Sequence, residues 1–249
     1  MSDWGRPHFV PGGGDATVFY VAFGPRLKKL ELSTATYRTR GVPPGVEVAN
    51  HDREGHPEIF RDLLGNPFAH FLEEQLPSLA AHVQEAPSAT VVRGTVKDPP
   101  SLEYLRDTIG IVTAVLDQSI ALLDPLALRW WAAPAWREEV FEPDEPSPQS
   151  HVAILKSEET ATGTTWIHTR GMRKFGRPDL SIRGVAPVYE PAIHDLCDRF
   201  IDLQALGGMI TEGAAVRMKE LPEGMTCHHA GSLDDPDFNN VHVQVRWPD

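Results

Sequence analysis

Hydrophobic residues recur along the first half of the chain in two different periods. Runs of β-branched and aromatic residues predict buried strands near residues 17–23, 90–96 and 119–124. A helical period is clearest after Asp98-Pro99-Pro100, where apolar residues recur every three or four positions: Leu102, Leu105, Ile109, Val112 and Leu116. Asp98 is expected to cap this helix, and Gly110 within it indicates a close approach to a sheet. Shorter helices are expected over residues 57–64 and 67–85.

The second half of the chain shows mostly the alternating period of strands. Strands are expected near residues 151–156, 164–168, 214–218, 225–229 and 241–247, with a further strand over residues 180–185. One amphipathic helix is expected over residues 191–206, followed by Gly207. Strands therefore dominate this half, with one covering helix.

These patterns predict an α+β (or α/β) fold made of two sheet-plus-helix modules. Each module is expected to have a mixed or antiparallel sheet with helices packed on one face. The segment 142–149 contains three prolines and three acidic residues, which is typical of a stiff, solvated linker. We therefore expect an N-terminal module over residues 1–141 and a C-terminal module over residues 150–249.

Composition limits the classes of partner. The 249 residues carry a formal net charge of −12, which argues against a nucleic-acid partner and permits a protein partner with a basic surface. The longest apolar run, within residues 109–123, is interrupted by Asp117 and Gln118, and it is too short to span a membrane. With two cysteines and no leader-like start, the sequence predicts a soluble, cytoplasmic protein.

A basic segment stands out in this acidic chain. Between Arg170 and Arg183 there are five basic residues and one acidic residue, Asp179. Arginine side chains and exposed N–H groups near glycine suit a carboxylate or a phosphate. The candidate anion-binding residues are His168, Arg170, Arg173 and Lys174.

Two other interpretations of this segment stay open. In one, Gly171 and Gly176 allow a structural turn that ties the loop to the sheet through hydrogen bonds from His168 or Arg170. In the other, His168 acts as a catalytic base at the end of its strand. The segment thus fits an anion site, a turn or a base.

A second cluster combines thiol, imidazole and carboxylate groups near the C-terminus. Cys227, His229 and His242 are the candidate metal ligands, although their spacing matches no known metal motif. The alternative interpretation is a strand followed by an Asp-Pro turn. Asp124, at the end of a predicted strand, is a further candidate ligand position. No cofactor is predicted.

The basic segment also carries a family resemblance. The residues 168–172, with Phe175-Gly176 and 178–180, form the pattern HTRGMxxFGxP(D/E), which resembles a family of uncharacterised bacterial proteins. The resemblance implies a recurring local structure and transfers no catalytic role. Serine-hydrolase, zinc-protease, Walker and Rossmann motifs are absent from the sequence. We therefore expect a non-catalytic binding or interaction protein, or alternatively an enzyme or binder that acts on a small anionic ligand through His168 and Arg170.

Overall fold

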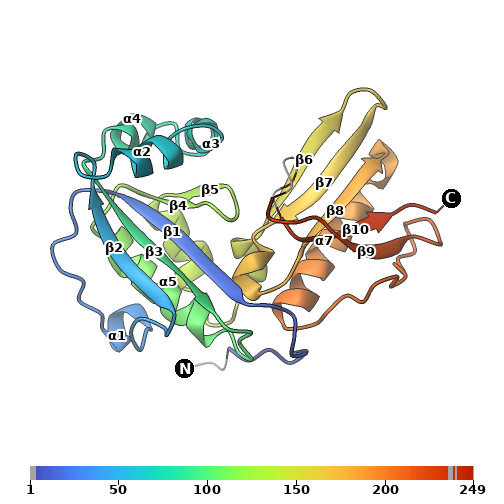
Figure 1. Cartoon of the computed structure of the whole chain (residues 1–249), viewed down its shortest axis with the longest axis horizontal. Helices are drawn as coiled ribbons and strands as arrows, with labels where there is room; N and C mark the ends of the chain where they lie inside the picture. The colour runs from blue at the N-terminus through green and yellow to red at the C-terminus, as the bar shows by residue number, and fades with distance from the viewer. Residues whose placement is uncertain (1–3, 235–237, 239, 249) are drawn as a thin grey trace.

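The computed structural model describes residues 4–234, 238 and 240–248, and it contains two five-stranded sheets side by side (Figure 1). The expected α+β class is confirmed. In the first sheet the strand order is β2-β3-β1-β4-β5, and every neighbouring pair is antiparallel. Its strands are β1 (Ala16–Gly24), β2 (Val46–Asp52), β3 (Ser88–Val96), β4 (Ala121–Asp124) and β5 (Arg129–Trp131).

The second sheet is mixed. Its strand order is β6-β7-β8-β10-β9, in which β8 and β10 are parallel and the other neighbours are antiparallel. Its strands are β6 (Ala153–Glu159), β7 (Thr164–Arg170), β8 (Asp179–Val185), β9 (Thr226–Ala230) and β10 (His242–Arg246).

The helices are mostly short. The α-helices are α1 (Thr34–Tyr37), α2 (Pro57–Leu63), α3 (Phe68–Gln75), α4 (Ala80–Gln84), α5 (Glu103–Leu116), α6 (Ala133–Trp136) and α7 (Glu190–Ala205). A π turn, η1 (Arg137–Phe141), follows α6, and the 3₁₀ turns are η2 (Pro148–His151), η3 (Met172–Phe175) and η4 (Pro187–Tyr189). No helix in the described part of the chain is long and apolar enough to cross a membrane.

Helices cover both faces of the first sheet, because its strands carry apolar residues on both sides. Tyr20 and its alternate neighbours on β1 pack with Ile109 and the rest of the apolar stripe of α5. On the opposite face, Phe23 packs with Phe60 of α2 and Leu72 of α3. In Figure 1, α2, α3 and α4 gather over one end of this sheet, and α5 lies along the other face.

The second sheet has its helix on one face. Ile167 of β7 and Val243 of β10 pack against Ile193 and Phe200 of α7 in a separate apolar cluster. The alternate residues of the same strands point to the other face, which carries the polar and aromatic residues described below.

The two modules share a core and are not independent bodies on a free linker. Met172 and Phe175 of η3, in the second module, belong to the same apolar cluster as Tyr20 of the first. Arg6 adds a polar connection, since its buried guanidinium donates to the carbonyls of four residues from both modules: Pro99, Phe175, Gln204 and Ala205. The two sheets are therefore fixed relative to each other by packing.

Four local expectations differ from the structure. The helix expected from Asp98 begins at Glu103, and Asp98 has φ of 25° and accepts a hydrogen bond from Gly12, so it is not the cap. Residues 67–85 form two helices, which are separated at Leu76-Pro77 because proline cannot continue the hydrogen-bond ladder. Residues 46–52, for which the sequence predicts no strand or helix, form the half-exposed strand β2. Residues 214–218 form only an isolated bridge at Ala215 instead of a strand.

Candidate anion-binding surface

Strand β7 ends at Arg170, the first residue of the basic segment, and the alternation of its side chains separates two sets. Ile167 faces the core beneath α7, whereas Trp166, His168 and Arg170 share the opposite face of the sheet. Ser181, which pairs with His168 in register, accepts a hydrogen bond from the Trp166 indole N–H at 2.9 Å. The helix-free face of the second sheet therefore presents a polar and aromatic strip.

The strip forms a compact arrangement that we name the arginine–aromatic cluster: Trp166, His168, Arg170, Arg183 and Phe238. The rings of Trp166 and His168 stack with centroids 4.1 Å apart, and Phe238 meets both rings edge-on. The Arg183 guanidinium lies 4.1 Å from the Trp166 ring centroid, and that of Arg170 lies 4.1 Å from the Phe238 centroid. The attraction between each guanidinium and the ring beneath it stabilises the position of both groups.

Burial decides the protonation state of His168. The side chain is 5% exposed, and burial, aided by the charges of Arg170 and Arg183, lowers its pKa to about 3. Its neutral imidazole is a weak base at physiological pH, far from the pKa near 7 that favours general base catalysis. The geometry is therefore better suited to hydrogen bonding than to proton transfer.

Two buried nitrogen atoms of the cluster have no hydrogen-bond partner among the residues that the structure describes. They are Nδ1 of His168 and Nε of Arg170. Within the described residues, no hydrogen bond or ion pair reaches the Arg170 guanidinium, although the charge of Asp179 acts on it and raises its pKa against the larger effect of burial. An unfilled buried donor costs about 1–3 kcal/mol, so this part of the cluster has capacity for an acceptor from a ligand.

Lys174 lies elsewhere, inside the junction between the modules. Its ammonium group is 2.5 Å from Oδ2 of Asp124 and 2.5 Å from the carbonyl oxygen of His151, and the side chain is fully buried. Burial lowers the pKa of Lys174 and raises that of Asp124, and in each case the partner opposes the shift. Lys174 and Asp124 are candidate ligand-binding residues in the sequence. In the structure they bind each other instead.

The basic residues Arg173 and Arg177 also lie apart from the arginine–aromatic cluster. Arg173 is half-buried and lines two grooves at the junction, one beside Phe19 and one beside Gly14. Arg177 is buried and donates to the carbonyls of Val10, Gly207 and Gly208, as a structural residue would. Of the four predicted anion-binding residues, the structure brings only His168 and Arg170 together.

The structure does not gather the three predicted metal ligands. In the register of β9 and β10, Cys227 pairs with Val245 and His229 with Val243, whereas His242 pairs with Ala230 and so lies on the other face. Cys227 is buried in the core, and Nε2 of His229 is 2.8 Å from the carbonyl oxygen of Ile210. Across the described residues, no group of three His, Cys, Asp or Glu side chains is placed to hold a metal ion.

Sequence reasoning identified part of the arginine–aromatic cluster and missed the rest. Alternation along the strand expected over residues 164–168 places Trp166 and His168 on one face, and the structure extends this strand to Arg170. Phe238 carries no sequence signal, because it follows an Asp-rich segment with no strand period and meets the cluster only through the fold.

No protein-family model, curated protein or solved structure matches the chain. The family resemblance of the segment around His168 stays a prediction.

Proposed function

We propose that this protein is a non-catalytic binding protein that holds an acidic segment of a protein partner at the arginine–aromatic cluster. The observation that carries the proposal is that Nε of Arg170 and Nδ1 of His168, on the helix-free face of the second sheet, have no hydrogen-bond partner within the described ranges 4–234, 238 and 240–248. This function keeps the binding role expected from the sequence and the anion-binding residues of its alternative, but it replaces the expected partner with a basic surface by a partner with an acidic segment. With two buried free thiols, Cys197 and Cys227, we place the protein in a reducing compartment, the cytoplasm.

The contacts within the cluster favour carboxylates over flat aromatic ligands. Trp166 already has His168 on one face and Arg183 within cation–π distance, so a planar ligand would have to displace a neighbour. The N–H donors at the edge of the Arg170 guanidinium stay available to a ligand. Their planar arrangement matches the two oxygens of a carboxylate. Arg183 is partly engaged, since it lies 3.4 Å from Oε1 of Glu159. Arg170 is therefore the principal anchor.

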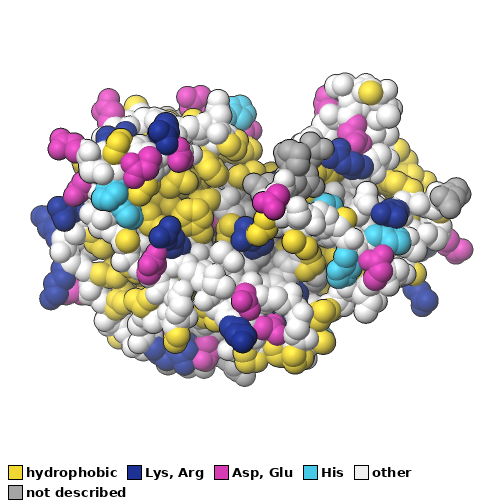
Figure 2. All heavy atoms as spheres, in the orientation of Figure 1, with side chains coloured by type: hydrophobic (Ala, Val, Ile, Leu, Met, Phe, Trp, Pro, Cys, Tyr) yellow, Lys and Arg dark blue, Asp and Glu magenta, His cyan; other side chains and the backbone are white. Residues whose placement is uncertain are grey.

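The shape and charge of the surroundings favour a protein segment as the ligand. The cluster lies on the helix-free face of the second sheet, where Trp166 and Arg170 are only half-buried and can be reached from the surface. Acidic side chains are spread over both modules in Figure 2, and the net charge is −12. Such a field repels an acidic partner from most of the surface, so it restricts productive contact to the local positive site.

The proposal is tested by titrating the full chain with a labelled glutamate-rich peptide and a matched glutamine-rich peptide. We expect the glutamate peptide alone to bind, and Arg170→Met to weaken binding about tenfold, as for loss of one charge-assisted hydrogen-bonded pair. Arg26→Met is the matched control, because Arg26 is an exposed surface arginine, 72% exposed, outside the cluster.

Three outcomes would contradict the proposal. One is equal binding of the two peptides, and another is an equal loss of affinity in the Arg26 variant. The third is binding of inorganic phosphate at Arg170 without any binding of the glutamate peptide, which would identify a small anion as the ligand instead.

A further inference from the structure

A groove lies between the two modules, where the last strand of the first sheet, β5, faces the first strand of the second, β6 (Figure 1). Its volume is about 360 Å³, and its walls include Leu128, Trp130, Ala135, Ala153 and Leu155. We propose that this groove, named here the β5–β6 groove, takes an apolar side chain of the acidic partner segment. The inference rests on the proposed function and adds a second requirement to the chemistry of that partner.

The register of β6 and β7 joins the β5–β6 groove to the arginine–aromatic cluster. Ala153 is opposite Arg170, and Leu155 is opposite His168. Directly opposed residues of two strands share one face of the sheet, with Cβ atoms about 4.5–5.5 Å apart. Since an extended chain rises about 3.3 Å per residue, a segment anchored at Arg170 reaches the groove within about two residues.

The lining of the groove favours an apolar side chain. Most of its residues are alanine, leucine or tryptophan. Among the described residues, its charged members are Arg129 and Glu139, which form an ion pair at 2.8 Å. The Arg129 guanidinium also lies 3.7 Å from the centroid of the Trp131 ring. Because these two charges compensate each other, burial of apolar surface is the main attraction that the groove offers.

Gln75 closes the edge of β5 to another strand. Its Oε1 accepts a hydrogen bond from the Trp130 N–H at 2.7 Å, and its Nε2 donates to the Leu128 carbonyl at 3.3 Å. A further strand would bond these same backbone groups, because β5 is the last strand of its sheet. The partner segment is therefore expected to enter the groove with a side chain and not to extend the first sheet.

Volume sets the size of that side chain. A cavity of about 150 Å³ can hold benzene, so the groove of about 360 Å³ has room for a phenylalanine ring. Ala153 and Leu155 are half-buried, so their outer surfaces can be reached by a ligand. The partner segment is thus expected to carry a large apolar residue within two positions of an acidic one.

The first test places one phenylalanine or one serine at the centre of the glutamate-rich peptide, so that glutamate lies on both sides of it. We expect the phenylalanine peptide to bind the full chain about tenfold more tightly than the serine peptide, as for burial of a large apolar side chain. The glutamine-rich peptide with the same phenylalanine should bind at least about tenfold more weakly than its glutamate counterpart. A gain below about twofold from phenylalanine, or equal binding of the glutamate and glutamine versions, would overturn the inference.

The second test fills the groove without changing the cluster. Ala135→Phe, on α6, is expected to remove the advantage of phenylalanine over serine and to leave the affinity for the serine peptide unchanged. Ala81→Phe is the matched control, because Ala81 is exposed on α4 outside the groove. Leu155→Ala removes part of the groove wall and should lower the advantage about threefold, so the test stays decisive if the Ala135 variant fails to fold.

A full advantage of phenylalanine in the folded groove variants would also overturn the inference. Its failure is distinguishable from failure of the proposed function. If the serine peptide binds and needs Arg170, but phenylalanine adds nothing, only the groove is excluded. If neither glutamate peptide binds, both proposals are wrong.

Discussion

The neighbours of His168 determine its pKa and therefore its protonation state. An isolated histidine titrates near pH 6.5, but here the ring is buried between Trp166 and Phe238 beside two arginines. Protonation would add a third positive charge in a site with little solvent, so the neutral form is favoured and the pKa falls to about 3. The residue therefore serves as a packed, neutral hydrogen-bonding group.

This shift predicts a pH dependence of stability. Because the folded pKa lies below the unfolded value, the unfolded chain binds the extra proton between about pH 6.5 and pH 3, and stability falls as the pH falls through this window. In His168→Phe the loss should be smaller, by up to about 1.4 kcal/mol per pH unit. The measurement is urea unfolding of both proteins from pH 7 to pH 4. Parallel curves would show that His168 does not contribute.

Helix α5 is the most enclosed helix in the described structure. Each of its residues from Tyr104 to Leu116 is buried, and Gly110 lets the backbone of the segment after α1 approach it. A Cβ atom at Gly110 would lie 2.1 Å from the carbonyl oxygen of Tyr37 and 2.8 Å from Cβ of Thr39. The close approach expected from the sequence is thus made by this segment and not by a sheet.

Packing and helix propensity make opposite predictions for Gly110→Ala. Propensity alone would stabilise the helix by about 1 kcal/mol, but the clash is with backbone and requires α5 to move. We expect a net loss of about 1–3 kcal/mol, as in overpacked cores. Gly55→Ala is the control, since its Cβ would meet only the Asp52 carbonyl oxygen at 3.8 Å. Equal stability of the two variants in thermal unfolding would refute this account.

At the scale of the whole molecule, the buried pair of Lys174 and Asp124 joins the modules. Asp124 ends β4 in the first sheet, whereas Lys174 lies in η3, directly after the β7 strand of the second. The backbone carbonyl of Lys174 accepts a further hydrogen bond from Tyr104 of α5. The charged pair and the surrounding apolar cluster therefore fix one sheet against the other.

Removing one member of this pair should destabilise the fold more than removing the charges of both members. Lys174→Met leaves Asp124 buried without its counter-ion, and we expect a loss of about 3–5 kcal/mol. The double variant Lys174→Met, Asp124→Asn keeps an acceptor for the Ala127 N–H and should recover most of that loss. Urea unfolding of the single and double variants forms the cycle. A double variant no more stable than the single one would contradict the charge argument.

The sequence by itself determined the features that depend on local periodicity. Buried strands such as β1 and β3 appear as β-branched runs, and the stripe from Leu102 to Leu116 identifies α5, because burial of one face imposes its period on the residues. Alternation also placed Trp166 and His168 on one face of the strand expected over residues 164–168, whereas the continuation of β7 to Arg170 is seen only in the structure. These predictions need only the conformation of a single element.

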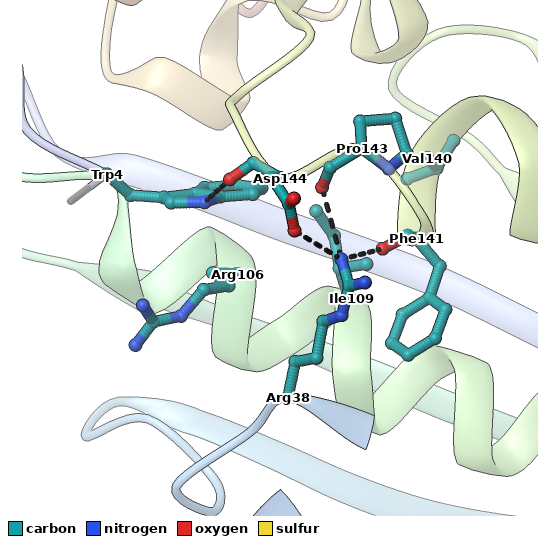
Figure 3. Close-up of a pocket in the computed structure, with 8 residues that line it drawn as sticks. All are labelled: Trp4, Arg38, Arg106, Ile109, Val140, Phe141, Pro143 and Asp144. Carbon is teal, nitrogen blue, oxygen red and sulfur yellow. Dashed lines mark hydrogen bonds and ion pairs between the residues drawn. The ribbon is translucent and has the colours of Figure 1, made fainter. Parts of the chain in front are cut away.

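Only the tertiary structure decided what each charged residue does. Whether a lysine in a basic segment binds a ligand or a buried aspartate depends on which surfaces pack together, as Lys174 and Asp124 show. The cavity lined by Trp4, Arg106 and residues 140–144 (Figure 3) likewise depends on segments that are far apart in sequence. The role of a charged residue and the position of a cavity depend on non-local contacts. The periodicity of a single helix or strand does not encode these contacts.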